Sequence, residues 1–230
     1  MRHSQTPALD LALIVDTTGS MGTHIHEIRR QLLEVVAELR EHIADLRCSV
    51  IAFKDHDASY TTKVLAPTRS LSRVMSFLCS PELEAGLGGG GAEAVECALR
   101  EANGLHWRRN ARRVGILIGD KPPHGGGLDT FSECPCHVDY RDEIEDLAAR
   151  EVSLYTVRVG QCLEAQRVFE YFAARTGGVF LDELHVRDLP SSIASVCHRE
   201  AGDLASYRRR LEAAGRLTRG RANLLHSLAA

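Results

Sequence analysis

Stretches typical of buried strands alternate with stretches typical of amphipathic helices along most of the chain. Residues 9–15 form a continuous apolar run that ends at Asp16, and such a run is typical of a strand covered on both faces. In residues 23–46, apolar side chains recur every three or four positions, which predicts a helix packed on one face. This alternation constrains the fold most, because strands separated by helices pair in parallel through right-handed crossovers.

The pattern continues to about residue 205. Residues 60–65 alternate between polar and apolar side chains, as an edge strand does. We therefore predict an α/β fold, a Rossmann-like three-layer sandwich with a mostly parallel central sheet, one antiparallel edge strand and helices on both faces. We expect one domain over residues 8–204 and a basic helical tail over 205–230. Further strands are predicted at 48–53, 114–118, 152–159 and 178–182, and further helices at 71–78, 92–104, 139–150, 163–175 and from 189 onward.

Composition and charge argue against several classes of partner. The 230 residues carry a net charge of −3, which gives no overall attraction to nucleic acid or to acidic membranes. No apolar run approaches the roughly 18 residues needed to cross a bilayer, and the polar first residues do not resemble a secretory signal. The seven cysteines are an odd number, and several fall in predicted core elements. We therefore expect reduced thiols and a cytoplasmic protein.

Three oxygen-bearing side chains follow the first predicted strand at alternate positions, namely Asp16, Thr18 and Ser20. In an extended turn this spacing points them the same way, and a carboxylate with two hydroxyls suits a hard cation such as Mg²⁺. Asp120 follows a second apolar strand, and ligands of α/β sheets bind at the carboxyl ends of strands. We predict a site for Mg²⁺, or for Mn²⁺ or Ca²⁺, at these four residues. Alternatively, the small polar side chains only cap the turn.

This combination resembles a known family. Asp16-Thr17-Thr18-Gly19-Ser20 is similar to the metal-ion-dependent adhesion site of von Willebrand factor A domains, and Ile116-Leu117-Ile118-Gly119-Asp120 resembles the later strand that completes that site. Pro122-Pro123-His124-Gly125 and Cys134-Pro135-Cys136 resemble a bacterial and protist branch that includes domains linked to alpha-kinases. The resemblance covers roughly residues 8–200. It implies a non-catalytic module that captures a carboxylate of an acidic protein partner, in a bacterial signalling, stress or conflict system.

The chain departs from the family pattern at one ligand. The family supplies a threonine, or in this branch often an aspartate, from the loop before the third helix, and the matching position here is Gly90. Glu93 is the nearest oxygen donor, but it matches a glutamate at the start of the helix, where the helix dipole favours an acid. Gly90, Glu93, Asp55 and His124 are therefore candidates for the rim of the site and for partner contacts. Ordinary loop positions are the alternative.

A second metal site is a further hypothesis. Cys134-Pro135-Cys136-His137 offers three zinc ligands, Cys134, Cys136 and His137, with His124 as a candidate fourth. Structural zinc takes four ligands, usually with a Cys-x₂₋₄-Cys spacing, and the spacing here is tighter. A loop of reduced cysteines is the alternative that the sequence favours.

Two other functions compete with the binding module. One is a metal-independent scaffold: if the loop ligand is missing and the site is degenerate, the domain binds its partner without a metal. Asp16-Thr17-Thr18-Gly19-Ser20 also resembles the phosphoacceptor segment of haloacid dehalogenase-like phosphatases, in which the aspartate attacks phosphorus beside Mg²⁺. That chemistry usually needs an acid where His124 stands and a lysine on the intervening segment, and residues 66–120 contain none. We therefore expect no enzymatic activity.

Overall fold

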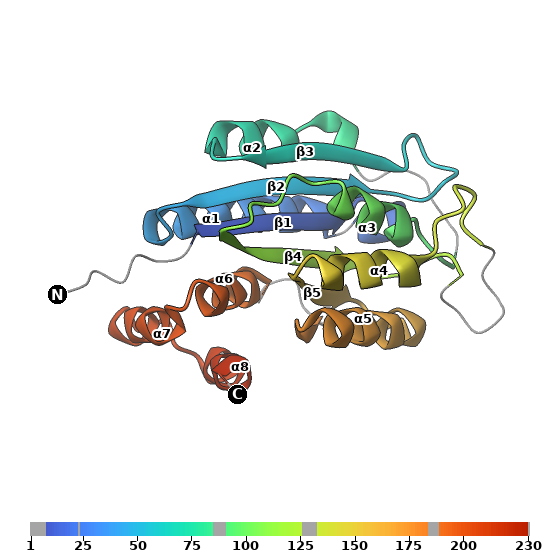
Figure 1. Cartoon of the computed structure of the whole chain (residues 1–230). Helices are drawn as coiled ribbons and strands as arrows, with labels where there is room; N and C mark the ends of the chain where they lie inside the picture. Colours follow the sequence, from blue (N-terminus) through green and yellow to red (C-terminus); the bar gives the residue numbers. More distant parts are fainter. Residues whose placement is uncertain (1–7, 23, 85–90, 126–132, 184–188, 230) are drawn as a thin grey trace.

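A twisted sheet of mostly parallel strands forms the centre of the molecule (Figure 1). The computed structural model describes residues 8–22, 24–84, 91–125, 133–183 and 189–229. Within these residues the strand order is β3-β2-β1-β4-β5-β6, and β3 alone pairs antiparallel. The predicted fold class, including the antiparallel edge strand, is confirmed. The strands are β1 (Ala8–Asp16), β2 (Leu46–Phe53), β3 (Thr62–Thr68), β4 (Ala111–Gly119), β5 (Val152–Val159) and β6 (Phe180–Glu183).

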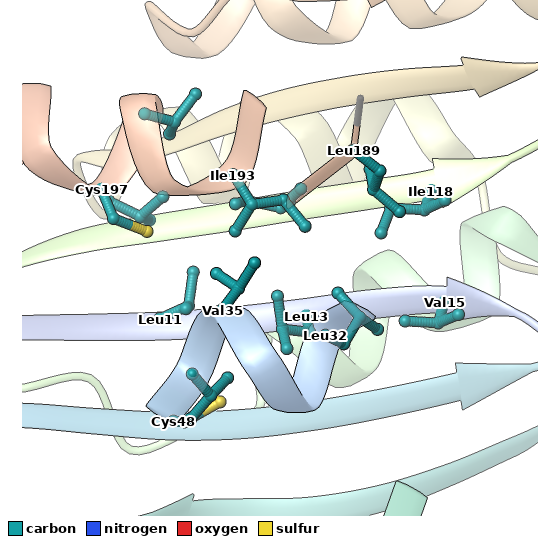
Figure 2. Close-up of a cluster of buried hydrophobic side chains, with 14 of the residues drawn as sticks. Leu11, Leu13, Val15, Leu32, Val35, Cys48, Ile118, Leu189, Ile193 and Cys197 are labelled. Carbon is teal, nitrogen blue, oxygen red and sulfur yellow. The ribbon is translucent and has the colours of Figure 1, made fainter. Parts of the chain in front are cut away.

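Helices cover both faces of the sheet, which explains the unbroken apolar run of β1. Successive β1 side chains point to opposite faces, so Leu11 and Leu13 join one core cluster whereas Ala12 and Ile14 join the other. The first cluster lies under α1 (Ile25–His42), α2 (Leu71–Leu78) and α6 (Leu189–Glu200). The second lies under α3 (Val95–Asn103), α4 (Tyr140–Ala149) and α5 (Leu163–Thr176). Figure 2 shows the first cluster, with side chains from β1, α1 and α6, among them Leu11, Leu13, Val15, Leu32, Val35, Ile193 and Cys197.

Several predicted element boundaries shift for identifiable reasons. Ser70 caps α2 at the predicted start of that helix, because its Oγ accepts a hydrogen bond from the Arg73 amide at 3.3 Å. β4 is longer than the predicted 114–118. Its polar start, which includes Arg112 and Arg113, pairs with both β1 and β5. Backbone pairing thus extends the strand beyond its apolar centre. α3 begins at Val95 instead of at residue 92, which matters for the site.

The basic tail folds back onto the domain. It forms α7 (Leu204–Ala213) and α8 (Arg219–Ala229), which lie with α6 at one end of the molecule (Figure 1). Tyr207, Leu211 and Leu225 pack with Ala194 of α6, while Arg208 and Arg209 stay exposed. Apolar contacts to α6 therefore hold the tail. None of the described helices is long and apolar enough to cross a membrane.

Candidate metal centre

The candidate site lies at the carboxyl edge of the sheet, beside its central strand. Asp16 ends β1, which pairs with β2 on one side and β4 on the other, so the strand order reverses here, as it does at ligand sites of α/β sheets. The next residue anchors the loop, because the Thr17 amide and hydroxyl both donate to the Phe53 carbonyl oxygen, at 2.9 and 2.8 Å. The loop that carries Thr18 and Ser20 is thereby fixed against the end of β2.

The four predicted cation ligands converge through direct contacts. The Asp16 Oδ1 accepts hydrogen bonds from the Thr18 amide at 2.8 Å and from the Thr18 hydroxyl at 2.7 Å. The Ser20 hydroxyl lies 2.9 Å from the Thr18 hydroxyl and donates to Asp120 Oδ1 at 3.0 Å. Two loops that are a hundred residues apart in sequence therefore meet in one cluster of oxygen atoms, as the sequence predicted.

Glu93 belongs to the same cluster. The Ser20 hydroxyl also contacts Glu93 Oε1 at 3.2 Å, and one carboxylate oxygen each from Asp16, Glu93 and Asp120 lie within 4.8 Å of one another. The expectation that Glu93 is an acid of the helix's first turn is wrong, because α3 begins at Val95 and its first-turn acid is Glu96.

The backbone explains where Glu93 lies. Its amide donates to the Pro122 carbonyl at 3.0 Å, and it forms an isolated parallel bridge with Pro123. This pairing holds the segment before α3 against the loop after β4. Glu93 is 4% exposed, so its carboxylate is placed inside the cluster. The expected loop ligand position, Gly90, lies outside the described residues.

The electrostatics of this cluster favour a cation. Burial raises the pKa of Asp16 well above its usual range, and the neighbouring Glu93 adds to the effect. Burial likewise raises the pKa of Glu93, and burial together with the charge of Asp16 raises the pKa of Asp120 to about 6. Asp16 Oδ2 and Glu93 Oε2 are buried without a hydrogen-bond partner in the described structure. Buried acceptors are ordinarily paired, so an all-oxygen site with two free acceptors fits a hard divalent cation.

The remaining predicted rim residues form a pair beside the cluster. His124 Nε2 lies 2.7 Å from Asp55 Oδ1, and the His124 amide donates to the Glu96 carboxylate at 3.2 Å. These contacts connect the loop after β4 to the end of β2 and to α3. The pair therefore positions the walls of the site.

The cysteine loop clusters differently from the prediction. Cys134 and Cys136 do lie near a histidine, but that residue is His56, with ring nitrogens 3.5 Å from Cys134 Sγ and 3.9 Å from Cys136 Sγ. Cys97 adds a third sulfur, 3.7 Å from that of Cys134. His137 is exposed and is absent from the group of potential ligands found among the described residues. The sequence missed His56 and Cys97 because both lie far from residues 134–137 in the chain.

Comparison with known proteins bears on the family and the fold. The model of the von Willebrand factor type A domain matches residues 10–180. The chain is 25% identical over 195 residues to "Alpha-protein kinase vwkA" of Dictyostelium discoideum, covering 81% of this chain and 31% of the relative. It is also 25% identical over 179 residues to "Putative ariadne-like RING finger protein R811" of Acanthamoeba polyphaga mimivirus, covering 74% of this chain and 18% of that protein. The chain thus spans less than a third of either relative.

A solved structure shares the fold. An aerotolerance-related membrane protein from Bacteroides fragilis NCTC 9343, carrying multiple mutations to serines, superposes with a TM-score of 0.56 at 12% sequence identity. The alignment covers 84% of this chain and 100% of that structure, which supports the fold alone. Because the family match extends over most of the chain, from residue 10 to residue 180, the chain belongs to the von Willebrand factor type A domain family.

Proposed function

We propose that this chain is a non-catalytic protein-binding module that captures an acidic side chain of a partner through a bound divalent cation. Domains of this family generally act as protein-interaction modules. Metal-dependent binding is supported by two buried oxygens without a hydrogen-bond partner, Asp16 Oδ2 and Glu93 Oε2, which lie inside a cluster of three carboxylates. A cation supplies the missing partner for both oxygens.

The donor set indicates how the cation is held. Asp16 and Asp120 supply carboxylate oxygens, and Thr18 and Ser20 supply hydroxyl oxygens, which are the ligands that Mg²⁺ prefers; Mn²⁺ and Ca²⁺ accept the same donors. Glu93 is the candidate for the ligand that the family pattern places at Gly90. Mg²⁺ usually retains several waters, and Ser20 is exposed at the mouth of the site. A partner carboxylate replaces one of these waters.

One feature supports a binding role over phosphatase chemistry. His124 stands where a phosphatase of the haloacid dehalogenase type usually has an acid, and its ring faces Asp55. The relatives are named as a kinase and a RING finger protein, which supports a place in a signalling, stress or conflict system. All seven cysteines are free thiols, in keeping with the proposed cytoplasmic location.

Water-proton relaxation with Mn²⁺ tests this function, because it reports the waters on the bound ion. We expect Mn²⁺ to show enhanced relaxation on the full chain, and acetate to reduce the enhancement by displacing water, whereas the uncharged acetamide leaves it unchanged. Asp16→Asn removes the enhancement. Enhancement that acetate does not alter would contradict carboxylate capture. Enhancement absent from the native chain would favour the metal-independent scaffold.

A further inference from the structure

A second group of side chains, chemically unlike the first, lies between α3 and the loops that follow β2 and β4. His56, Cys97, Cys134 and Cys136 each offer one ligand atom, and these four atoms lie within 4.8 Å of one another. Cys97 and Cys134 are buried, at 1% and 4% exposure. We propose that these four residues bind one structural zinc ion, a site that does not depend on the proposed carboxylate capture.

The distances between the ligand atoms are close to those of tetrahedral zinc. Zinc lies about 2.3 Å from cysteine sulfur and about 2.0–2.1 Å from histidine nitrogen, so tetrahedral angles place two sulfurs about 3.8 Å apart and a sulfur and a nitrogen about 3.5 Å apart. Cys97 Sγ and Cys134 Sγ are 3.7 Å apart, and Cys136 Sγ lies 3.9 Å from His56 Nδ1. The first distance matches tetrahedral zinc and the second is slightly longer, so the four ligand atoms, all within 4.8 Å of one another, would draw closer together around the ion.

A buried carboxylate completes the surroundings of the histidine. Glu96 is fully buried, and its Oε1 lies 3.0 Å from His56 Nε2. Metal-binding histidines usually donate their second ring N–H to such a group, which fixes the tautomer and the ring. A proton on Nε2, directed at Glu96, leaves the Nδ1 lone pair on the side of Cys136, whose sulfur lies 3.9 Å away.

The donor set selects a different metal from the oxygen cluster. Three thiolates and an imidazole favour zinc, whereas carboxylates and hydroxyls favour magnesium. Binding replaces the three thiol protons, which pass to solvent. Four protein ligands close the coordination shell, which is the arrangement of structural zinc sites.

Such a zinc ion would connect three distant parts of the chain. Cys97 and Cys134 are 37 positions apart, and His56 and Cys134 are 78 apart. The loop after β4, which starts at Asp120 and includes His124, would be fixed to α3 and to the end of β2. The zinc ion would therefore stabilise the wall of the neighbouring oxygen cluster without touching its ligands.

Metal analysis of the full chain tests this site. We expect elemental mass spectrometry of protein purified in zinc-containing medium without chelator to find about one zinc ion per chain. Substitution with Co²⁺ should give the absorption of a tetrahedral site with sulfur-to-cobalt charge transfer from three thiolates. His56→Ala and Cys97→Ser should lose the metal, as should Cys136→Ser, whose exposed position makes it the variant best tolerated by the fold. Cys79→Ser and His137→Ala should retain it.

Each contrary result has a distinct meaning. A native chain that holds neither zinc nor tetrahedral Co²⁺ would overturn the proposal. A Cys97–Cys134 disulfide in intact mass spectra of the metal-free native chain would show that these two cysteines form a redox pair and would contradict the zinc site. Loss of zinc in His137→Ala with retention in His56→Ala would show that His137 is the ligand, as the sequence predicted, and that His56 is not. Circular dichroism of each variant separates metal loss from unfolding.

Discussion

At the scale of single residues, Glu93 is a side chain whose position was predicted wrongly from the sequence: it lies in the oxygen cluster and not in the first turn of α3. Asp16, Thr18, Ser20 and Asp120 could be predicted as neighbours because they follow two apolar strands that end at the same edge of the sheet. Glu93 enters the cluster only because its backbone pairs with Pro122 and Pro123. A contact set by two loops leaves no periodic signal in the sequence.

Glu93→Gln should therefore have two opposite effects. It removes a charge beside Asp16 and Asp120, so the metal-free chain should become more stable to urea. It also removes a cation ligand, so the affinity for Mg²⁺ should fall by about tenfold or more. Glu41→Gln, at an exposed position of α1, is the control and should change neither quantity. Unchanged Mg²⁺ affinity in Glu93→Gln would place Glu93 outside the coordination shell.

At the scale of elements, a buried ion cluster joins the amino ends of the central strands. Asp10 of β1 is 2% exposed. Its carboxylate accepts hydrogen bonds from the Arg47 side chain of β2, at 2.9 and 2.7 Å. It also accepts from the Arg108 amide, before β4, at 2.8 Å. Although burial opposes ionisation, the hydrogen bonds from Arg47 and Arg108 outweigh it and lower the pKa of Asp10.

This cluster predicts a pH-dependent stability. A carboxyl with a lowered pKa in the folded state stabilises the fold above its unfolded pKa, about 3.9, and that contribution is lost as the pH falls through the folded value. Asp10→Asn should lower the free energy of unfolding by about 3 kcal/mol at pH 7. The difference from the native chain should shrink below about pH 4. Urea denaturation at several pH values measures it.

Asp45→Asn is the matched control, because Asp45 binds the same arginine, Arg108, but is 41% exposed. Exposed ion pairs contribute less, so its cost should stay below about 1 kcal/mol. Equal costs for Asp10→Asn and Asp45→Asn would show that burial of the Asp10 cluster does not add to stability.

At the scale of the whole molecule, the sequence predicted the sheet better than it predicted what packs around it. Continuous apolar strands alternate with amphipathic helices in the sequence, and this pattern was enough to predict the three layers, because a strand buried on both faces, such as β1, needs helices on both sides. The packing of α7 and α8 could not be predicted, because their apolar side chains are few and only some of them, such as Leu211 and Leu225, reach α6. The grouping of His56 with Cys97 could be recognised only from the three-dimensional contacts.

The fold also places the buried ion cluster of Asp10 far from the candidate cation site. The Asp10 cluster lies at the amino ends of the strands, whereas the Asp16 cluster lies at their carboxyl ends. Substitutions in the Asp16 cluster should therefore change cation binding while the sheet stays folded.

The most direct test of the central claim is a calorimetric titration of the full chain, dialysed free of Mg²⁺ and Mn²⁺, with each ion in turn. We predict saturable binding at about one site per chain, its loss in Asp16→Asn, and an unchanged far-ultraviolet circular dichroism spectrum in that variant. Absence of saturable binding by the native chain at millimolar Mg²⁺ and Mn²⁺, or equal binding by Asp16→Asn, would contradict a cation site at Asp16.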